Sequence, residues 1–496
     1  MFTNNFKQYT YVKFLGKGVQ AVVNQHKDQN QIIAVKNYLP TADGDIDFGA
    51  IKEVNFLQKL VRCSHVNQLI DVDFIVTQDS LFIRLATNYY TSDLDYFIRT
   101  QSIDVKLNYF SSITNQLLEA LYVLHYRGII HCDIKPPNIM IDDQNRVYLA
   151  DFGLAVQLPC DEKYRDILLT RQGSPLYLAP EILTYNDYYN DKIDLWSLGI
   201  TLLEYLTNNI VTDPPMIFLN NNEDNVSIIY QILTLSHLQP DKMNYGLIKH
   251  KQLHGMIDVH AILHQYQIIL SQQNTQLLTS LLQINPLDRL NITSYQFNVC
   301  QYQYDILPRG DLHAENFLSQ YYDALYQLIE ICDNLILKVS TCLLAIDLFE
   351  RYVVHFKLTD LKLASATCLL LMTKLNESIN LDCDDIVTSY HNIFTKEKLQ
   401  LTQIIIFKRF NFVLTSCETD ELLHFFNDLT LSQLQSFHVS KQLVNVKMTQ
   451  SIKINLIEHQ IIYPLLLKTF KELHLNGIFS GSLFAFEMIE YVENNI

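Results

Sequence analysis

Four polar side chains stand close together in residues 131–153, which read HCDIKPPNIMIDDQNRVYLADFG. Asp133 lies two residues before Lys135 and five before Asn138, and a second carboxylate, Asp151, follows in DFG. These side chains supply a base that orients an attacking hydroxyl, a cation for a migrating anionic group and two oxygen ligands for Mg²⁺. Transfer of a phosphoryl group needs this set of groups.

The two motifs in this stretch resemble the catalytic loop and the metal-binding loop of protein kinases, in the serine/threonine version. The resemblance implies that Asp133 and Lys135 are catalytic. It also implies that Asn138 and Asp151 hold Mg²⁺ and that ATP is the phosphoryl donor to a protein substrate. A DFG alone is weak, whereas both motifs at this spacing are specific for the kinase fold.

A glycine-rich turn earlier in the chain is the candidate for the phosphate-binding part of an ATP site. The segment YVKFLGKGVQAVVNQ alternates apolar and polar residues around the turn, which predicts a strand, a hairpin and a second strand. Two glycines are also compatible with a plain turn, and Ala21 stands where kinases have their third glycine. The resemblance assigns these residues to the ATP site: Leu15, Gly16, Gly18, Val23, Ala34, Lys36, Glu53 and Tyr90.

A short strand and the helix after it must position this site. Lys36 ends the apolar strand IIAVK, and apolar residues at helical spacing predict a helix over about 46–60 that carries Glu53. In kinases this lysine holds the nucleotide phosphates while paired with the glutamate. Taken alone, a lysine that ends a strand normally lies at a solvated strand edge. Counting back from the next helix indicates Thr87 as gatekeeper and 88–90 as the segment that meets adenine.

The helix around Glu53 has a more specific resemblance. DFGAIKEVNFL is similar to the PSTAIRE-type helix of cyclin-dependent kinases, which is the surface that a cyclin grips. Farther along, Glu181 and Arg289 resemble the buried ion pair that anchors the activation segment. DLWSLG, with Asp194, resembles the helix that braces the catalytic loop.

After a polar connector the pattern predicts helices at about 316–332, 336–352, 359–377, 383–392 and 395–411, with Thr359 and Thr395 as N-caps. TCLLAIDLFERYV and LASATCLLLMTKLNES resemble helices of the cyclin box. A generic helical bundle is the alternative.

Two residues of this helical part are candidates for contact with the kinase. Lys374 falls where cyclins carry a lysine that bonds kinase backbone, and Gln403 replaces the glutamate that usually acts beside it. An amide donates and accepts hydrogen bonds without charge assistance, so we expect a weaker contact here. Taken alone, Lys374 is compatible with a solvated charge.

The predicted fold is an α+β bilobal protein kinase fold followed by an all-α cyclin-like helical domain. The predicted bounds are 1–305 for the kinase domain (N lobe about 7–90, C lobe about 91–305), 306–315 for a linker and 316–428 for the cyclin-box-like domain. For 429–496 the pattern predicts helices, with a degenerate second cyclin repeat as one interpretation.

A PSTAIRE-like helix and a cyclin-like domain in one chain favour activation within the chain. The resemblance implies that the domain packs on the Glu53 helix and turns it inward until Glu53 meets Lys36. Tethering gives an effective concentration on the order of millimolar. Pairing in trans between two chains is the alternative.

Several departures from cyclin-dependent kinases concern regulation. The three arginines that clasp an activating phosphothreonine correspond to Lys52, Cys132 and Val156. Thr170, near the usual site, therefore has few cationic partners. The inhibitory Thr-Tyr pair of the glycine-rich turn is Val-Gln here. Leu178 stands where proline-directed kinases carry an arginine, so proline direction stays open.

The composition is that of a globular protein with more than one domain: 496 residues, 48% hydrophobic and 18% charged. A net charge of −16 argues against nucleic-acid binding. The 9 cysteines form no CxxC pair, and no signal-peptide core or long apolar run occurs. We expect no zinc site, no membrane contact, and an intracellular protein of the cytoplasm or nucleus.

Three rival interpretations fit the same residues. One is a pseudokinase scaffold that recruits another kinase or binds partners without catalysis, since Ala21 and Cys132 are irregular. Another is a decoy whose cyclin-like half recruits a different kinase. The last is an ordinary kinase with an unrelated helical appendage lying away from the Glu53 helix.

Overall fold

The computed structural model describes residues 9–18, 20–28, 31–42, 44–77, 80–157, 173–183, 190–208, 257–295, 315–356, 360–377 and 381–415, with Phe6 and Phe297. Several predicted features lie outside these residues: Val19, Thr170, Thr359, most of the linker 306–315, and the region 429–496. Within the described part, no helix has the length and apolar character that crossing a bilayer requires.

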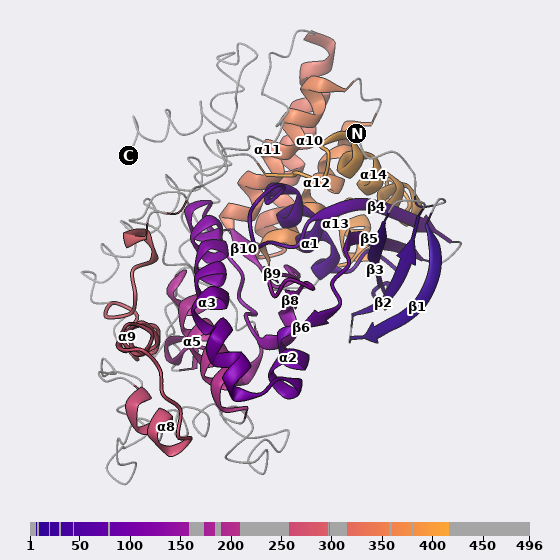
Figure 1. Ribbon diagram of the computed structural model, residues 1–496. Coiled ribbons are helices and arrows are strands. Elements are labelled where there is room, and N and C mark those ends of the chain that lie inside the picture. The colour runs from indigo at the N-terminus through magenta and orange to yellow at the C-terminus, as the bar shows by residue number, and fades with distance from the viewer. Residues whose placement is uncertain are drawn as a thin grey trace, which may run out of the picture.

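The described strands of the N lobe form an antiparallel sheet in the order β1-β2-β3-β5-β4 (Figure 1). They are β1 (Thr10–Lys17), β2 (Ala21–Lys27), β3 (Ile32–Tyr38), β4 (Leu69–Val76) and β5 (Leu81–Asn88). Ile33 and Val35 of β3 are buried on one face of the sheet, whereas Lys36 and Tyr38 lie on the other face. The predicted hairpin is confirmed by the pairing of β1 with β2.

Helix α1 (Phe48–Lys59) carries Glu53. It begins at Phe48 rather than at the predicted 46, because the Asp47 carboxylate caps it by accepting a hydrogen bond from the Ala50 amide at 3.2 Å. All residues from 49 to 59 are buried, charged ones included. A helix without an exposed face must be covered by more than its own sheet.

The C lobe surrounds the buried helix α5. Its described helices are α2 (Leu94–Thr100), α3 (Ile103–Tyr126), α4 (Pro180–Leu183), α5 (Lys192–Thr207), α8 (Val259–Gln265) and α9 (Gln272–Leu281). β6 (Ser92–Asp93), β8 (Ile139–Ile141) and β9 (Val147–Leu149) form one small sheet, and β7 (Ile129–Ile130) pairs with β10 (Val156–Gln157). The loop with Asp133 lies between β7 and β8, so paired strands fix both of its ends.

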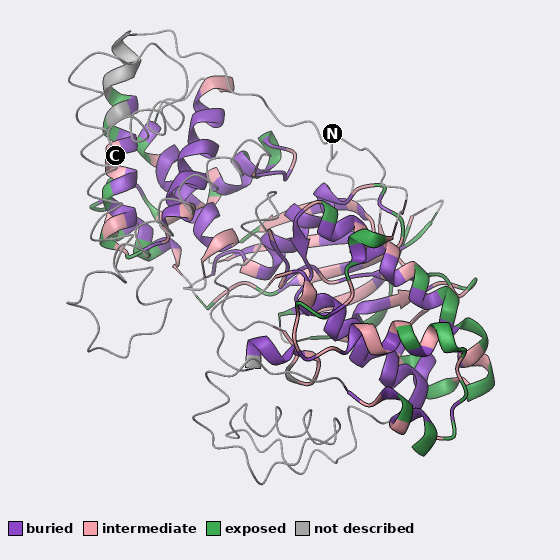
Figure 2. Cartoon of the chain, turned by 90° about the vertical axis from the view of Figure 1, so that its left-hand side faces the viewer, coloured by how far each residue is buried: buried purple, intermediate pink, exposed green. Residues whose placement is uncertain are grey.

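The described part of the second domain consists of α10 (Glu315–Asn334), α11 (Val339–His355), α12 (Leu361–Asn376), α13 (Cys383–Ser389) and α14 (Lys396–Arg409). It lies beside α1 and β4 (Figure 1). Buried residues run along helices of both domains (Figure 2), and one apolar cluster joins them. The rival interpretation of an appendage lying away from the Glu53 helix is therefore wrong.

Several predicted helix ends need correction. The cap of α12 is Asp360 and not Thr359, since the Asp360 carboxylate accepts from Leu363 N at 3.0 Å. α11 starts after 336 and α13 stops before 392, because Ile336 and Asn392 both have left-handed backbone at φ 56°. Thr395 caps α14 as predicted.

Candidate active site

Lys36 links the N lobe to the DFG motif. Its Nζ is 2.8 Å from Glu53 Oε2 on α1 and 2.8 Å from Asp151 Oδ1. Burial by itself lowers the pKa of Lys36, but the Glu53 carboxylate holds that pKa well above its usual value. Burial raises the pKa of Glu53 against the opposing charge of Lys36. Burial also acts to raise the pKa of Asp151, yet Lys36 keeps it below its usual range.

A hydroxyl that the sequence analysis missed also reaches Glu53. Tyr38 Oη donates to Glu53 Oε2, the oxygen that also accepts from Lys36. The Tyr38 ring is buried, and Lys36 Nζ lies 4.8 Å from its centroid. Because residues two apart on a strand share a face, the signal was present in the spacing of Lys36 and Tyr38 on β3.

Both carboxylate oxygens of the buried Asp133 have polar partners. Asn138 Nδ2 and Lys135 Nζ each lie 2.8 Å from Oδ2. Ser174 donates to Oδ1 from its hydroxyl at 2.8 Å and from its amide at 3.1 Å. Lys135 Nζ also donates to Ser174 Oγ at 2.7 Å. The base and the cation of the predicted catalytic pair are thus in contact and oriented.

Ser174 was not predicted, because its distance along the chain from Asp133 carries no signal of contact. The preceding Gly173 has φ +116°, and a Cβ there would meet the Cys132 carbonyl oxygen at 2.5 Å. The segment approaches the catalytic loop so closely that it requires glycine. This close approach brings Ser174 to Asp133.

The residues present fit a Mg²⁺ site that also uses phosphate oxygens. The side chain of Asp151 is 45% exposed, and Asn138 uses its amide nitrogen on Asp133, which leaves the amide oxygen for a metal. Mg²⁺ is commonly held by one or two carboxylates together with substrate phosphates. In the part of the chain that the structure describes, no group of three His, Cys, Asp or Glu side chains is arranged to hold a metal.

The other residues predicted for the ATP site lie near Lys36 on the sheet. Val23 is directly opposite Lys36 and Gly16 is opposite Val23, so they share its face. The same face includes Ala34, paired with the predicted gatekeeper Thr87. Leu15 follows Phe14 on β1, and Gly18 closes the turn by donating to Ala21 O at 2.9 Å. Tyr90 follows β5, and its ring centroid lies 4.7 Å from that of Tyr148.

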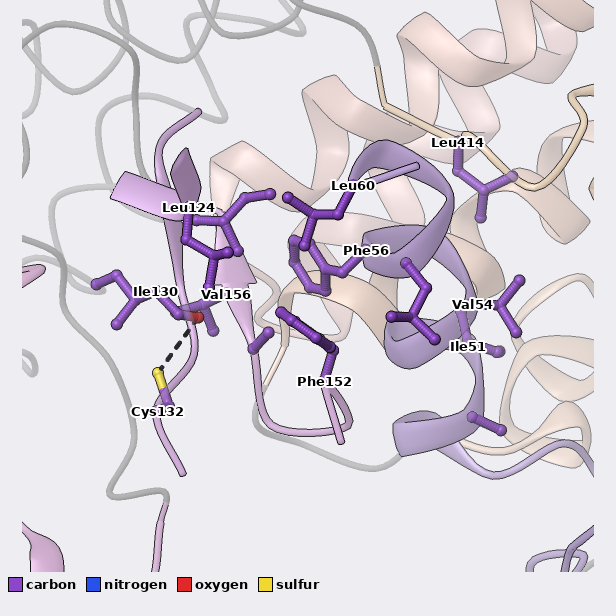
Figure 3. Packing of buried hydrophobic residues seen from close by; sticks show 14 of the residues in the cluster. Ile51, Val54, Phe56, Leu60, Leu124, Ile130, Cys132, Phe152, Val156 and Leu414 are labelled. Carbon is purple, nitrogen blue, oxygen red and sulfur yellow. Dashed lines mark hydrogen bonds between the residues drawn. The ribbon is translucent and has the colours of Figure 1, made fainter. Parts of the chain in front are cut away.

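Phe152 of the DFG motif joins the metal-binding loop to α1. Its ring is fully buried and lies beside Phe56 and Leu60, and the same apolar group continues to Leu414 of the helical domain (Figure 3). The position of α1 and that of the DFG motif are therefore coupled by packing.

Buried polar contacts hold the frame of the site. The Asp194 carboxylate accepts from His131 N at 2.8 Å and from Cys132 N at 3.0 Å, which fixes the backbone of the catalytic loop. Arg289 forms two hydrogen bonds to Glu181, at 2.7 and 3.0 Å. Both contacts agree with the predicted structural roles.

The three positions that correspond to the arginine clasp of cyclin-dependent kinases are largely apolar. Cys132 and Val156 are buried in the cluster of Figure 3. Lys52 is the remaining cation, and burial lowers its pKa. A phosphate would meet few cationic partners here.

The structure brings Lys374 and Gln403 to the segment before α1. Lys374 Nζ donates to the Asp45 carboxylate, and its distance to Ile46 O is 3.4 Å. The expectation of a contact without charge assistance is wrong, because the kinase side supplies a carboxylate that the sequence analysis did not single out.

The fold and the site define a bilobal kinase joined to a cyclin-like helical domain. The family model described as the protein kinase domain matches residues 9–301, and that of the cyclin N-terminal domain matches residues 310–415. The chain belongs to the protein kinase family. After its kinase domain it carries a domain of the type found at the N-terminus of cyclins.

Curated relatives match the kinase part. Serine/threonine-protein kinase KIN28 of Saccharomyces cerevisiae is 30% identical over 203 residues, which cover 40% of this chain and 63% of the relative. Cyclin-dependent kinase 7 of Xenopus laevis is 31% identical over 207 residues, 40% of this chain and 56% of the relative. The phosphorylase b kinase gamma catalytic chain, liver/testis isoform, of Bos taurus is 30% identical over 215 residues, which cover 40% of this chain and 51% of the relative. The chain thus spans less than two thirds of each of these relatives.

Proposed function

We propose that this chain transfers the γ-phosphoryl group of ATP to serine or threonine of protein substrates. The observation that carries the proposal is that Lys36 bridges Glu53 and Asp151 while Asp133 contacts Lys135. The relatives named serine/threonine kinases support the class of acceptor.

Each side chain has a role that follows from its contacts. Asp133 accepts a hydrogen bond from the substrate hydroxyl and orients it, since partners fix its carboxylate. Lys135 lies beside Asp133, where its charge favours the migrating phosphoryl group. Lys36 would hold the nucleotide phosphates. Asn138 and Asp151 would hold Mg²⁺, which supplies charge neutralisation at those phosphates.

The same geometry supports activation of the kinase by its own cyclin domain, which we include in the proposal. Leu414 N donates to Asn55 Oδ1 on α1 at 3.2 Å, and Lys59 Nζ donates to Thr415 Oγ1 at 2.6 Å. Because Glu53 is on α1, contacts that fix this helix also fix its pairing with Lys36.

The catalytic part is tested with the full chain after phosphatase treatment, on a peptide library with Mg-ATP. We expect phosphotransfer that Asp133→Asn reduces by roughly a hundredfold or more, with ATP binding retained. An inactive phosphate-free protein would contradict the proposal and favour the pseudokinase scaffold.

Activation within the chain is tested by dilution. Specific activity of the full chain is expected to stay constant from micromolar to nanomolar protein, because the domains are tethered. Residues 1–305 alone are expected to be less active. Activity that falls on dilution would indicate pairing in trans, and a fully active fragment would contradict cyclin activation.

A further inference from the structure

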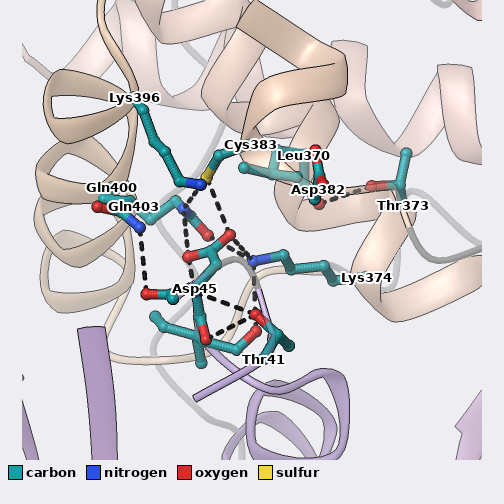
Figure 4. A network of polar contacts seen from close by, with 12 residues as sticks. Thr41, Asp45, Leu370, Thr373, Lys374, Asp382, Cys383, Lys396, Gln400 and Gln403 are labelled. Carbon is teal, nitrogen blue, oxygen red and sulfur yellow. Dashed lines mark hydrogen bonds and ion pairs between the residues drawn. The ribbon is translucent and has the colours of Figure 1, made fainter. Parts of the chain in front are cut away.

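A buried polar cluster joins the kinase domain to the cyclin domain. It consists of Asp45 in the segment before α1, Lys374 on α12, Cys383 on α13 and Gln403 on α14 (Figure 4). Each of these residues is at most 1% exposed. Three cyclin-domain helices therefore converge on one kinase carboxylate.

Both oxygens of Asp45 are occupied. Oδ2 accepts from Lys374 Nζ and, at 3.0 Å, from Cys383 Sγ. Oδ1 accepts from Gln403 Nε2 at 3.2 Å and from the Ile46 amide at 2.8 Å. Burial alone would raise the pKa of Asp45, but the charge of Lys374 holds it below its usual value. The Lys374 ammonium therefore favours the ionised form of this carboxylate and forms an ion pair with it.

Gln403 makes two contacts of opposite sense. Its nitrogen donates to Asp45, and its oxygen accepts from Lys374 Nζ at 3.2 Å. An amide side chain offers a donor and an acceptor together without a charge. A glutamate at 403 would accept from Lys374 but would direct a second carboxylate at Asp45 Oδ1. Two carboxylates directed at the same Lys374 ammonium in a buried cluster are strongly unfavourable.

We propose that Asp45 and Gln403 are a matched pair that determines which cyclin-like domain this kinase domain accepts. The carboxylate of the cluster is on the kinase side, so the partner must present a neutral amide opposite it. A partner with a carboxylate at that position is rejected. The cyclin domain of this same chain meets the requirement. This inference rests on the docking described under the proposed function, and not on catalysis.

The test uses variants of the full chain in which the carboxylate is placed at residue 403 on the cyclin side instead of at residue 45 on the kinase side. Gln403→Glu is expected to lower phosphotransfer at neutral pH by at least tenfold and to increase hydrogen–deuterium exchange in residues 48–59. Adding Asp45→Asn to that variant leaves one carboxylate and one amide with exchanged positions. The double variant is expected to return to within about threefold of the wild type. Leu401→Glu, which adds the same charge on the exposed side of α14, is the matched control and is expected to change neither readout.

Two results would overturn the inference: a Gln403→Glu protein with unchanged exchange in residues 48–59, or a double variant no better than Asp45→Asn alone. If Gln403→Glu does not fold, the comparison of the double variant with Asp45→Asn decides by itself. Because hydrogen exchange requires no catalysis, the expected exchange pattern in an inactive protein would refute the proposed kinase activity and leave this inference standing.

Discussion

Replacing Tyr38 by phenylalanine removes one hydroxyl from the Lys36–Glu53 pair and keeps the buried ring. Tyr38 Oη and Lys36 Nζ both donate to Glu53 Oε2, so the variant leaves Glu53 with Lys36 as its charged partner. Lys36 Nζ lies 4.8 Å from the ring centroid, and phenylalanine keeps this contact between the ammonium and the ring. The substitution therefore isolates the hydrogen bond.

A hydrogen bond to a charged group contributes about 1.5–3 kcal/mol. Because Lys36 still holds Glu53, we expect a loss near the lower value, or about a tenfold fall in kcat/KM for ATP. The sign of the pH effect follows from the same contact. Burial raises the pKa of Glu53 above its usual value. The charge of Lys36 and the hydrogen bond from Tyr38 each act to lower this pKa and so offset part of the effect of burial. Loss of the hydroxyl raises this pKa, so the acid limb of the activity profile moves to higher pH.

The assay is steady-state phosphotransfer at varied ATP over a range of pH, with the melting temperature as a check on folding. Tyr96→Phe is the control, because that ring is 62% exposed and lies on α2. A Tyr38→Phe protein whose kcat/KM and acid limb equal those of the wild type would refute the reasoning.

Two further predictions concern the buried Glu181–Arg289 ion pair and the contact between β4 and the cyclin domain. Glu181→Gln leaves the buried Arg289 without its charged partner and is expected to lower the free energy of unfolding by about 3–5 kcal/mol. Calorimetry is expected to show a lower melting temperature. The KM for ATP, measured below the unfolding transition, is expected to stay unchanged. Phe74→Ala removes two ring contacts from β4 to the cyclin domain, with centroid distances of 6.1 and 6.2 Å. Such ring contacts contribute about 0.5–1.5 kcal/mol each, so the specific activity of Phe74→Ala is expected to fall severalfold. The control is Val76→Ala on the exposed end of the same strand, which is expected to leave the specific activity unchanged.

Short-range chemistry was readable from the sequence. Asp133, Lys135 and Asn138 lie within six residues, and the helical period around Glu53 predicted the helix α1. Local rules also gave Thr395 as a cap, since capping depends on residues within one turn. The predicted cap Thr359 was wrong by one residue, since Asp360 caps α12.

Contacts between distant segments that no family resemblance indicated were decided only by the tertiary structure. Ser174 reaches Asp133 because the chain passes the catalytic loop at a glycine. Asp45 meets Lys374 because two domains close on it. Neither residue has a periodic or spaced pattern that announces a partner, since side chains far apart in sequence become neighbours only when packing brings their backbones together. The residue types were in the chain, but their pairing is a property of the fold.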